Sequence, residues 1–316
     1  MQKALAGFIA GIVTTGLIWA GVSFTSSSLE STPETDTVSI PMPFMADPTD
    51  FHVSFCDPAR IAPLTPCLLV QAGGKRLVFG APLDMDWTAI GPLDGVFLLD
   101  GAPASSLGLL GLRYETWFAG RRAPLKLVAG ELMMDSVEAL DAALLVPDAQ
   151  SQIERPTALD SRIAGFAMRP VPPGRAGLDV FNTGDLIVAA TSSFNADGDQ
   201  QVGYLLQYGG RSLLIRGCGA SLEPLTGVPD TLITPAVSQI RLTESLRAAV
   251  QARQEARASE VRKTGRTCAS PAQIRDFAEQ YGLDQIVLLA RESDYSGADA
   301  GVQLLGKSGL SLSVGG

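Results

Sequence analysis

CLLVQAGGKRLVFGAP, residues 67–82, contains two short apolar runs separated by Gly73 and Gly74. Runs of this length bounded by turn residues are typical of β-strands, and adjacent glycines are typical of a hairpin turn. The stretch therefore predicts a β-hairpin. GYLLQYGGRSLLIRGCG, residues 203–219, predicts another hairpin for the same reason.

Further short apolar runs lie between Gly, Pro and Asp residues, and each predicts a strand. In chain order they are HVSFC (52–56), GVFLLDG (95–101), LKLVAG (125–130), DLIVAATSSF (185–194), DTLIT (230–234) and QIVLLA (285–290). Two stretches predict helices instead: residues 238–263, and residues 270–283 with Ser270 as N-cap and Pro271 as the first helical residue. No repeat of fixed period is present, which argues against a solenoid or propeller.

The chain has 316 residues, 46% of them hydrophobic, and a formal net charge of −9. This composition can bury a large core and is not that of a disordered protein. A nucleic-acid surface needs clustered Lys and Arg, whereas the basic residues here are spread among acids. We therefore expect no nucleic-acid partner.

Residues 4–24 carry no charged side chain over 21 positions and follow Lys3. A run of this length can cross a bilayer as one helix. A cleavable signal peptide has a shorter apolar core and ends at small residues of the A-x-A kind, which are not evident here. Residues 1–26 are therefore predicted to be an uncleaved membrane anchor, with a cleaved signal as the alternative.

The charges that flank this segment predict its orientation. Lys3 precedes it and acidic residues follow within residues 30–36, so the positive-inside tendency places the C-terminal bulk outside the cytoplasm, on the periplasmic side in a bacterium. Residues 27–50 are rich in Ser, Thr, Pro and acids and predict a disordered linker. The expected protein is single-pass, with one domain over residues 51–316.

The order of the predicted segments resembles the metallo-β-lactamase superfamily, in particular its ribonuclease Z-like branch, over roughly residues 51–295. Residues 67–82 are similar to the family's early hairpin, and LDGVFLLDGAPASSLGLLGL (93–112) to the strand and loop that normally carry His-x-His-x-Asp-His. RYETWFAGRRAPLKLVAGE (113–131) is similar to the helix, turn and strand that follow. The resemblance implies a four-layer αββα sandwich of the α/β (α+β) class, here preceded by one transmembrane helix.

The second half of the chain agrees with this resemblance. Residues 203–219 are similar to the hairpin whose end supplies an Asp that bridges two metals. SPAQIRDFAEQYGLDQIVLLA (270–290) is similar to the helix and strand that end in the last metal-binding His. The family implies a metal-dependent hydrolase, with zinc as the expected cofactor and about five imidazole and carboxylate ligands.

The ligands of that metal centre are missing from this chain. Its one histidine, His52, matches no ligand position. By the resemblance, the ligand positions are occupied by Asp100, Ala102, Ala104, Ser105, Asn195, Cys218 and Ala290. Ala cannot bind a metal, and Asp100 with Cys218 leaves at most two donors where four or more are needed. We therefore predict no zinc and no catalytic residues.

The resemblance also bears on the four cysteines, which have no C-x-x-C spacing. It places Cys218 at the bridging Asp and Cys268 at a site histidine, so that two thiols meet where metal ligands would. In an exported domain they can form a disulfide, as can Cys56 and Cys67, which bracket a Pro-rich turn. Buried free thiols are the alternative.

Other polar and aromatic groups have simpler explanations. Asn195, Asp197 and Asp199 match a calcium loop poorly and predict an acidic turn. Trp87 and Trp117, together with the neighbouring Phe118, are expected in the core rather than in a ligand cleft.

The expected function is that of a membrane-tethered, non-catalytic pseudoenzyme, serving as a binding or assembly module for an unknown protein or small-molecule ligand. The alternative is a divergent metal-dependent hydrolase that uses Asp84, Asp86 and Asp100 with a hard metal. A third possibility is a lipid or peptide carrier, which would have an apolar pocket at the C-terminal ends of the strands.

Overall fold

The structure is a computed structural model of the chain. It describes residues 50–56, 66–83, 85–102, 106–220, 228–283, 285–289, 302–304 and 311–314. The predicted membrane anchor and almost all of the predicted linker lie outside these residues. Among the helices that are described, none combines the length and the apolar character needed to span a bilayer.

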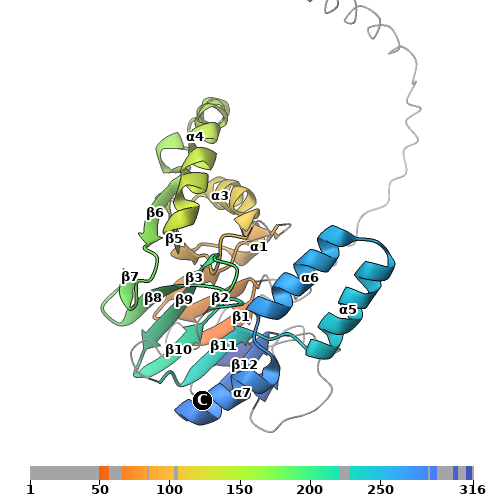
Figure 1. The fold of residues 1–316 in the computed structure, drawn as a ribbon. Coiled ribbons are helices and arrows are strands. Elements are labelled where there is room, and N and C mark those ends of the chain that lie inside the picture. Colours follow the sequence, from red (N-terminus) through yellow and green to blue (C-terminus); the bar gives the residue numbers. More distant parts are fainter. Residues whose placement is uncertain are drawn as a thin grey trace, which may run out of the picture. The chain divides into compact units, whose positions relative to one another are not determined.

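Within the described residues the strands form two seven-stranded sheets (Figure 1). The first sheet has the order β14-β1-β2-β3-β4-β5-β6. Its strands are β1 (His52–Phe55), β2 (Leu68–Ala72), β3 (Lys75–Phe79), β4 (Gly95–Phe97), β5 (Leu125–Gly130), β6 (Phe166–Val171) and β14 (Ser311–Ser313). Pairing is antiparallel from β14 to β3 and parallel from β3 to β6.

The predicted hairpin over residues 67–82 is confirmed as β2 and β3, with Gly73 and Gly74 in its turn. Both glycines have positive φ values, 55° and 69°, as the favoured two-residue hairpin turn requires. Gly73 also lies tightly against the second sheet, since an added Cβ would come within 2.9 Å of both Asp185 and Tyr208. The turn therefore needs glycine for its backbone and for this contact.

The second sheet has the order β13-β12-β11-β10-β9-β8-β7. Its strands are β7 (Leu178–Asn182), β8 (Leu186–Phe194), β9 (Gln200–Tyr208), β10 (Arg211–Ile215), β11 (Thr231–Pro235), β12 (Gln285–Leu289) and β13 (Val302–Leu304). Pairing is antiparallel from β7 to β10 and parallel from β10 to β13. The second predicted hairpin is confirmed as β9 and β10.

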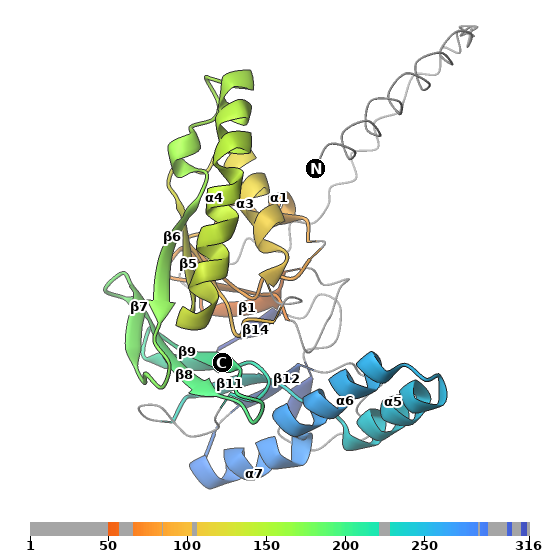
Figure 2. The same ribbon diagram turned by 45° about the horizontal axis from the view of Figure 1, so that its top comes forward.

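Helices cover the outer faces of both sheets, so the domain has four layers, as Figure 2 shows. The first sheet carries α1 (Trp87–Ile90), α3 (Leu109–Phe118) and α4 (Glu131–Glu154). On the other side lie α5 (Gln239–Gln251), α6 (Glu255–Thr267) and α7 (Pro271–Tyr281). The short 3-10 helix η1 (Ser161–Ile163) follows α4. The expected αββα arrangement is therefore found in the described domain.

Aromatic side chains fill the space between the two sheets. Phe79 and Phe97 stack with ring centroids 4.8 Å apart, and Tyr204 of the second sheet packs edge-on against both. The hydroxyl of Tyr204 donates a hydrogen bond to the carbonyl of Leu98 at 2.7 Å. The apolar faces of the strands therefore join the sheets into one core, and a cross-sheet hydrogen bond fixes their register.

Two local predictions need correction. Residues 238–263 are helical as expected, but they form parts of two helices, α5 and α6, because Arg253 takes a φ of 55° and turns the chain back. This reversal lets Gly265 of α6 lie against Leu242 of α5, which one straight helix cannot do. Phe118 is 46% exposed rather than core.

The other two aromatic predictions and the last helix are correct. Trp87 and Trp117 are each 1% exposed. Helix α7 begins with the expected N-cap, where the Ser270 side chain accepts a hydrogen bond from the backbone of Gln273, and Pro271 is its first residue. This capping box satisfies backbone groups that would otherwise lack a partner.

Candidate functional site

Two of the residues predicted to replace metal ligands, Asp100 and Cys218, lie at one end of the sandwich. Asp100 follows β4 and forms an isolated antiparallel bridge with Gln201 of β9. Cys218 follows β10, whose end reaches the same place because a Cβ added to Gly217 would lie 3.3 Å from Leu99. The first sheet's β4 and the second sheet's β10 therefore end beside each other.

Asn195 and Ala102 belong to the same region. A Cβ added to Gly219 would lie 2.9 Å from the Cβ of Asn195, so the β8–β9 turn touches the loop after β10. The backbone N–H of Ala102 donates to the Asp100 carboxylate at 2.8 Å. Four of the seven predicted positions are thus placed here, while Ala104, Ser105 and Ala290 lie outside the described residues.

A disulfide occupies the centre of this region. Cys218 is bonded to Cys268, the residue that ends α6, and their Cα atoms are 4.5 Å apart. This is the pair that the sequence analysis named. A second disulfide joins Cys56 to Cys67, with Cα atoms 5.3 Å apart. Among the described residues no cysteine is free, so none offers a thiolate.

Helix α6 also supplies positive charge to this region. Lys263 pairs with Asp199 at 2.6 Å and Arg266 pairs with Asp197 at 2.9 Å, both in the β8–β9 turn. The hydrogen bond to Asp199 raises the pKa of Lys263, and the nearby charges of Asp197 and Asp100 raise it further. The acids that a metal would attract are therefore held by protein cations.

Asn195 organises the β8–β9 turn rather than offering a free ligand atom. Its Oδ1 accepts hydrogen bonds from the backbone N–H groups of Asp197 at 3.0 Å and Asp199 at 2.9 Å. This is the side-chain-to-backbone pattern of an Asx turn. The predicted acidic turn is found, and calcium chemistry is not needed to explain it.

Comparison with known proteins depends on structure alone. No protein-family model matches the chain, and no curated protein matches it in sequence. The fold is similar to that of human tRNase Z, short form, at 13% identity and a TM-score of 0.55, over 83% of this chain and 99% of that one. It is also similar to YhfI of Bacillus subtilis, a metallo-β-lactamase fold protein, at 13% identity and a TM-score of 0.53 over 83% and 99%.

The chain has the metallo-β-lactamase fold. A diphosphatase from the PhnP family also matches, at 15% identity and a TM-score of 0.52, over 83% of this chain and 96% of that one. At these identities the likeness concerns the fold. Among the described residues, no cluster of three or more His, Cys, Asp or Glu side chains could hold a metal ion.

The residues predicted to replace the metal ligands do not fit a metal centre. The Cys218 sulfur is committed to a disulfide, the Asn195 oxygen to two N–H groups, and the Asp100 carboxylate accepts from Ala102. Metal sites of this kind need several deprotonated, uncommitted donors.

Arg216 adds a feature that the sequence analysis missed. It is 3% exposed, its Cγ lies beside Gly203, and its Nη1 has no hydrogen-bond partner within the described structure. Burial lowers its pKa to about 10, which leaves the guanidinium charged at neutral pH. A buried cation two residues before Cys218 disfavours a divalent cation at that strand end. The sequence does contain a signal of this buried cation, because an arginine directly follows the apolar residues in LLIRG.

The structure does not support the alternative metal site built from Asp84, Asp86 and Asp100. Asp86 is the N-cap of α1, and its carboxylate accepts from the backbone of Thr88 and Ala89, both at 3.1 Å. Asp84 lies outside the described residues. His52 lies in β1, where its Nε2 is 3.0 Å from the Asp50 carboxylate.

Proposed function

We propose that this chain is a membrane-tethered, non-catalytic protein of the metallo-β-lactamase fold, which keeps the scaffold as a binding or assembly module. The observation that carries the proposal is the Cys218–Cys268 disulfide. The resemblance puts Cys218 at the position of the metal-bridging Asp. Because the thiolate is the metal-binding form of cysteine, a disulfide sulfur at this position removes that bridge.

The charges around the disulfide support the same proposal. A di-metal centre concentrates positive charge and therefore needs anionic ligands that are free to bind it. Here Lys263 and Arg266 already neutralise the acids of the β8–β9 turn, and Arg216 adds a buried positive charge. We infer that helix α6 and its disulfide hold together strand ends that a metal holds in active relatives.

The alternative function is hydrolysis with a metal, by analogy with the named activities of the tRNase Z and the diphosphatase. No observation on the described residues favours it, because no group of suitable donors is present there. Fold likeness at this identity is a weak guide to activity. We therefore prefer the non-catalytic proposal.

Metal content tests the proposal. The oxidised full chain, dialysed against micromolar zinc and then against metal-free buffer, is expected to retain far less than one equivalent by elemental analysis, because uncommitted donors are missing. The matched control is the Cys218→Ser/Cys268→Ser variant, which has no thiol at either position. Zinc that the wild type retains and this variant does not retain would be held by Cys218 and Cys268 in their reduced form. Two tightly held metals per chain in the oxidised wild type would show that the proposal is wrong.

The membrane tether has its own expected outcome. With residues 1–26 intact, the chain should stay in the membrane fraction after washing in high salt, since salt releases electrostatic but not hydrophobic attachment. A variant that lacks residues 1–26 is the control and should be released. A soluble wild-type form that begins near residues 25–29 would instead indicate a cleaved signal.

A further inference from the structure

A cavity of about 240 Å³ lies between the two sheets, away from the disulfide region. Apolar side chains from both sheets line it, namely Phe97, Val128, Val180 and Phe181. Its lining combines the ends of β4 and β7 with the early part of β5, so it lies only partly at the C-terminal strand ends where a carrier pocket was expected. The cavity is smaller than the roughly 300–1,000 Å³ of ordinary ligand pockets, so an occupant must be small.

Two cations, both exposed to solvent, lie on the side of this apolar space. Lys126 lies two residues before Val128 on β5, and Arg169 two residues before Val171 on β6, so both share the inward face of their strand. The Nζ of Lys126 lies 5.0 Å from the ring centroid of Phe181. Inward-facing charges are unusual in a sandwich, where that face packs the core.

The position of the cavity explains how charged residues can stand there. β6 is the last described strand of the first sheet and β7 the last of the second, and Figures 1 and 2 show both on the same side of the molecule. The cavity therefore opens between the two sheet edges. A ligand could enter there without separating the sheets.

Neither cation is neutralised by the described protein. Arg169 donates one hydrogen bond from Nη2 to the backbone carbonyl of Asp179 at 2.5 Å. No carboxylate of the described residues forms an ion pair with Lys126 or Arg169. In a chain with net charge −9, two uncompensated cations on one apolar cavity are a distinct feature.

We propose that this cavity binds a small carboxylate with an apolar body, either aromatic or a short aliphatic chain. The apolar part would fill the space against Phe97 and Phe181, and the carboxylate would meet Lys126 and the free N–H groups of Arg169. Arg pairs with carboxylates through two parallel hydrogen bonds, and a nearby apolar wall strengthens such contacts. This inference is independent of the metal question.

The simpler explanation is protection of the sheet edges. Inward-pointing charges on edge strands prevent edge-to-edge aggregation. Both cations are exposed, as that role requires, but the role needs no ligand and so predicts no saturable binding. The two explanations can therefore be separated by experiment.

The test uses 19F NMR of 4-fluorophenylacetate with the full chain in zwitterionic nanodiscs. We expect saturable line broadening, little broadening of the neutral 4-fluorophenylacetamide, and none beyond background with empty nanodiscs. Displacement by hexanoate would extend the class to aliphatic carboxylates, and failure of displacement would restrict it to aromatic ones. No saturable binding of the carboxylate probe would refute the proposal and leave edge protection.

Two variants separate the cavity from general charge attraction. Lys126→Ala/Arg169→Ala should weaken binding tenfold or more, whereas Arg257→Ala, which removes an exposed arginine of α6, should leave it unchanged. Ala167→Leu keeps both cations but places a larger side chain on the cavity wall, and should also weaken binding tenfold or more. If Ala167→Leu, folded as judged by circular dichroism, binds like the wild type, the probe does not occupy the cavity and the proposal fails.

Discussion

Replacing Arg113 by Met is expected to lower the free energy of unfolding by about 3–5 kcal/mol, the usual cost of breaking a buried ion pair by removing one partner. The Arg113 side chain of α3 is 2% exposed and donates to Asp148 at 2.9 and 2.6 Å and to Asp141 at 2.8 Å. Burial alone would lower the pKa of Arg113, but these carboxylates outweigh it and raise that pKa. Without Arg113, the Asp148 carboxylate, 3% exposed, would be left buried without its cation.

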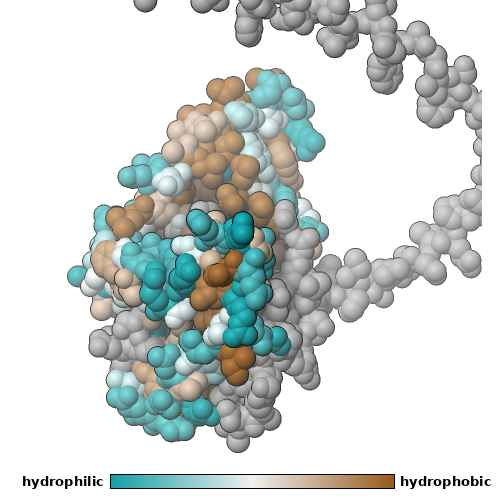
Figure 3. All heavy atoms as spheres, turned by 45° about the vertical axis from the view of Figure 1, so that its right-hand side comes forward, coloured by the Kyte–Doolittle hydropathy of each residue, from teal (hydrophilic) through white to brown (hydrophobic). Residues whose placement is uncertain are grey.

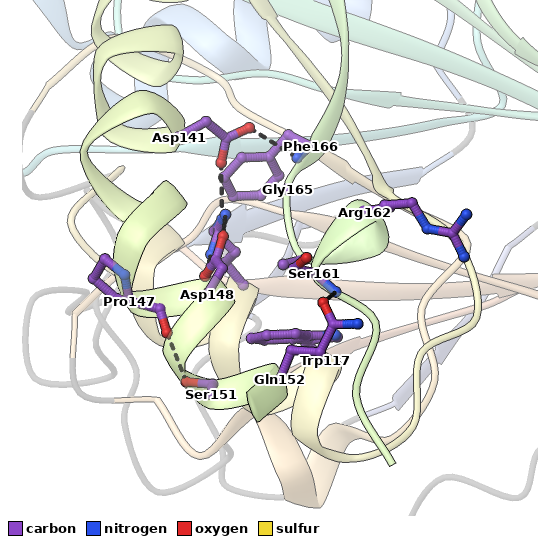
Figure 4. Close-up of polar contacts among 12 residues, drawn as sticks. Trp117, Asp141, Pro147, Asp148, Ser151, Gln152, Ser161, Arg162, Gly165 and Phe166 are labelled. Atoms are coloured by element: carbon purple, nitrogen blue, oxygen red, sulfur yellow. Dashed lines mark hydrogen bonds and ion pairs between the residues drawn. The ribbon is translucent and has the colours of Figure 1, made fainter. Parts of the chain in front are cut away.

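The same network positions the strand that follows. Asp141 also accepts the backbone N–H of Phe166 at 3.0 Å, which ties α4 to the start of β6 (Figure 4). Urea unfolding followed by tryptophan fluorescence measures the effect, because Trp117 is buried on the same helix as Arg113. The control is Arg113→Met/Asp148→Leu, which removes both charges and should recover most of the loss. A loss below about 1 kcal/mol in the single variant would mean that the pair is solvated.

Removing the Cys218–Cys268 disulfide is expected to cost about 4 kcal/mol, because the bond closes a separation of 50 residues in the unfolded chain. In the variant Cys218→Ala/Cys268→Ala, the ion pairs that still join α6 to the β8–β9 turn among the described residues are the exposed pairs of Lys263 and Arg266. Such exposed pairs contribute little. Urea unfolding without reductant measures the difference from the wild type.

The second disulfide is the matched control. Cys56→Ala/Cys67→Ala opens a separation of only 11 residues and is expected to cost about 3 kcal/mol on the same loop-entropy model. In the presence of reductant the wild type should lose the stability contributed by both bonds. If Cys218→Ala/Cys268→Ala has the same free energy of unfolding as the wild type without reductant, the Cys218–Cys268 bond contributes no stability. It then cannot be what replaces a metal cross-link.

Helix α4, the longest described helix, was not predicted from the sequence. In the second half of this helix the apolar residues face solvent and a charged residue faces the protein: Leu145, Val146 and Ile153 are exposed, while Asp148 is buried. Pro147 lies inside the helix and lacks an N–H, which ordinarily marks a helix end. Figure 3 shows apolar side chains gathered at the upper end of the molecule, where α4 lies. Tertiary ion pairing to Arg113 overrides the local signals.

The sequence by itself determined most of the described strands, the two hairpins and the capped start of α7, because strand length, turn glycines and capping residues act within a few positions of the chain. It did not predict β6, β7, β13 or β14. The single histidine likewise determined that the usual imidazole ligands are missing. These conclusions depend on residue identity and local spacing alone.

Only the tertiary structure decided which distant groups meet. Arg266 reaches Asp197 across 69 positions, and the burial of Arg216, whose Nη1 has no partner among the described residues, depends on how its strand packs. Lys126 and Arg169 lie 43 positions apart and share a cavity only because two sheet edges close on it. Local propensity does not encode such pairs, since the partner of a side chain depends on how the two sheets and their helices pack.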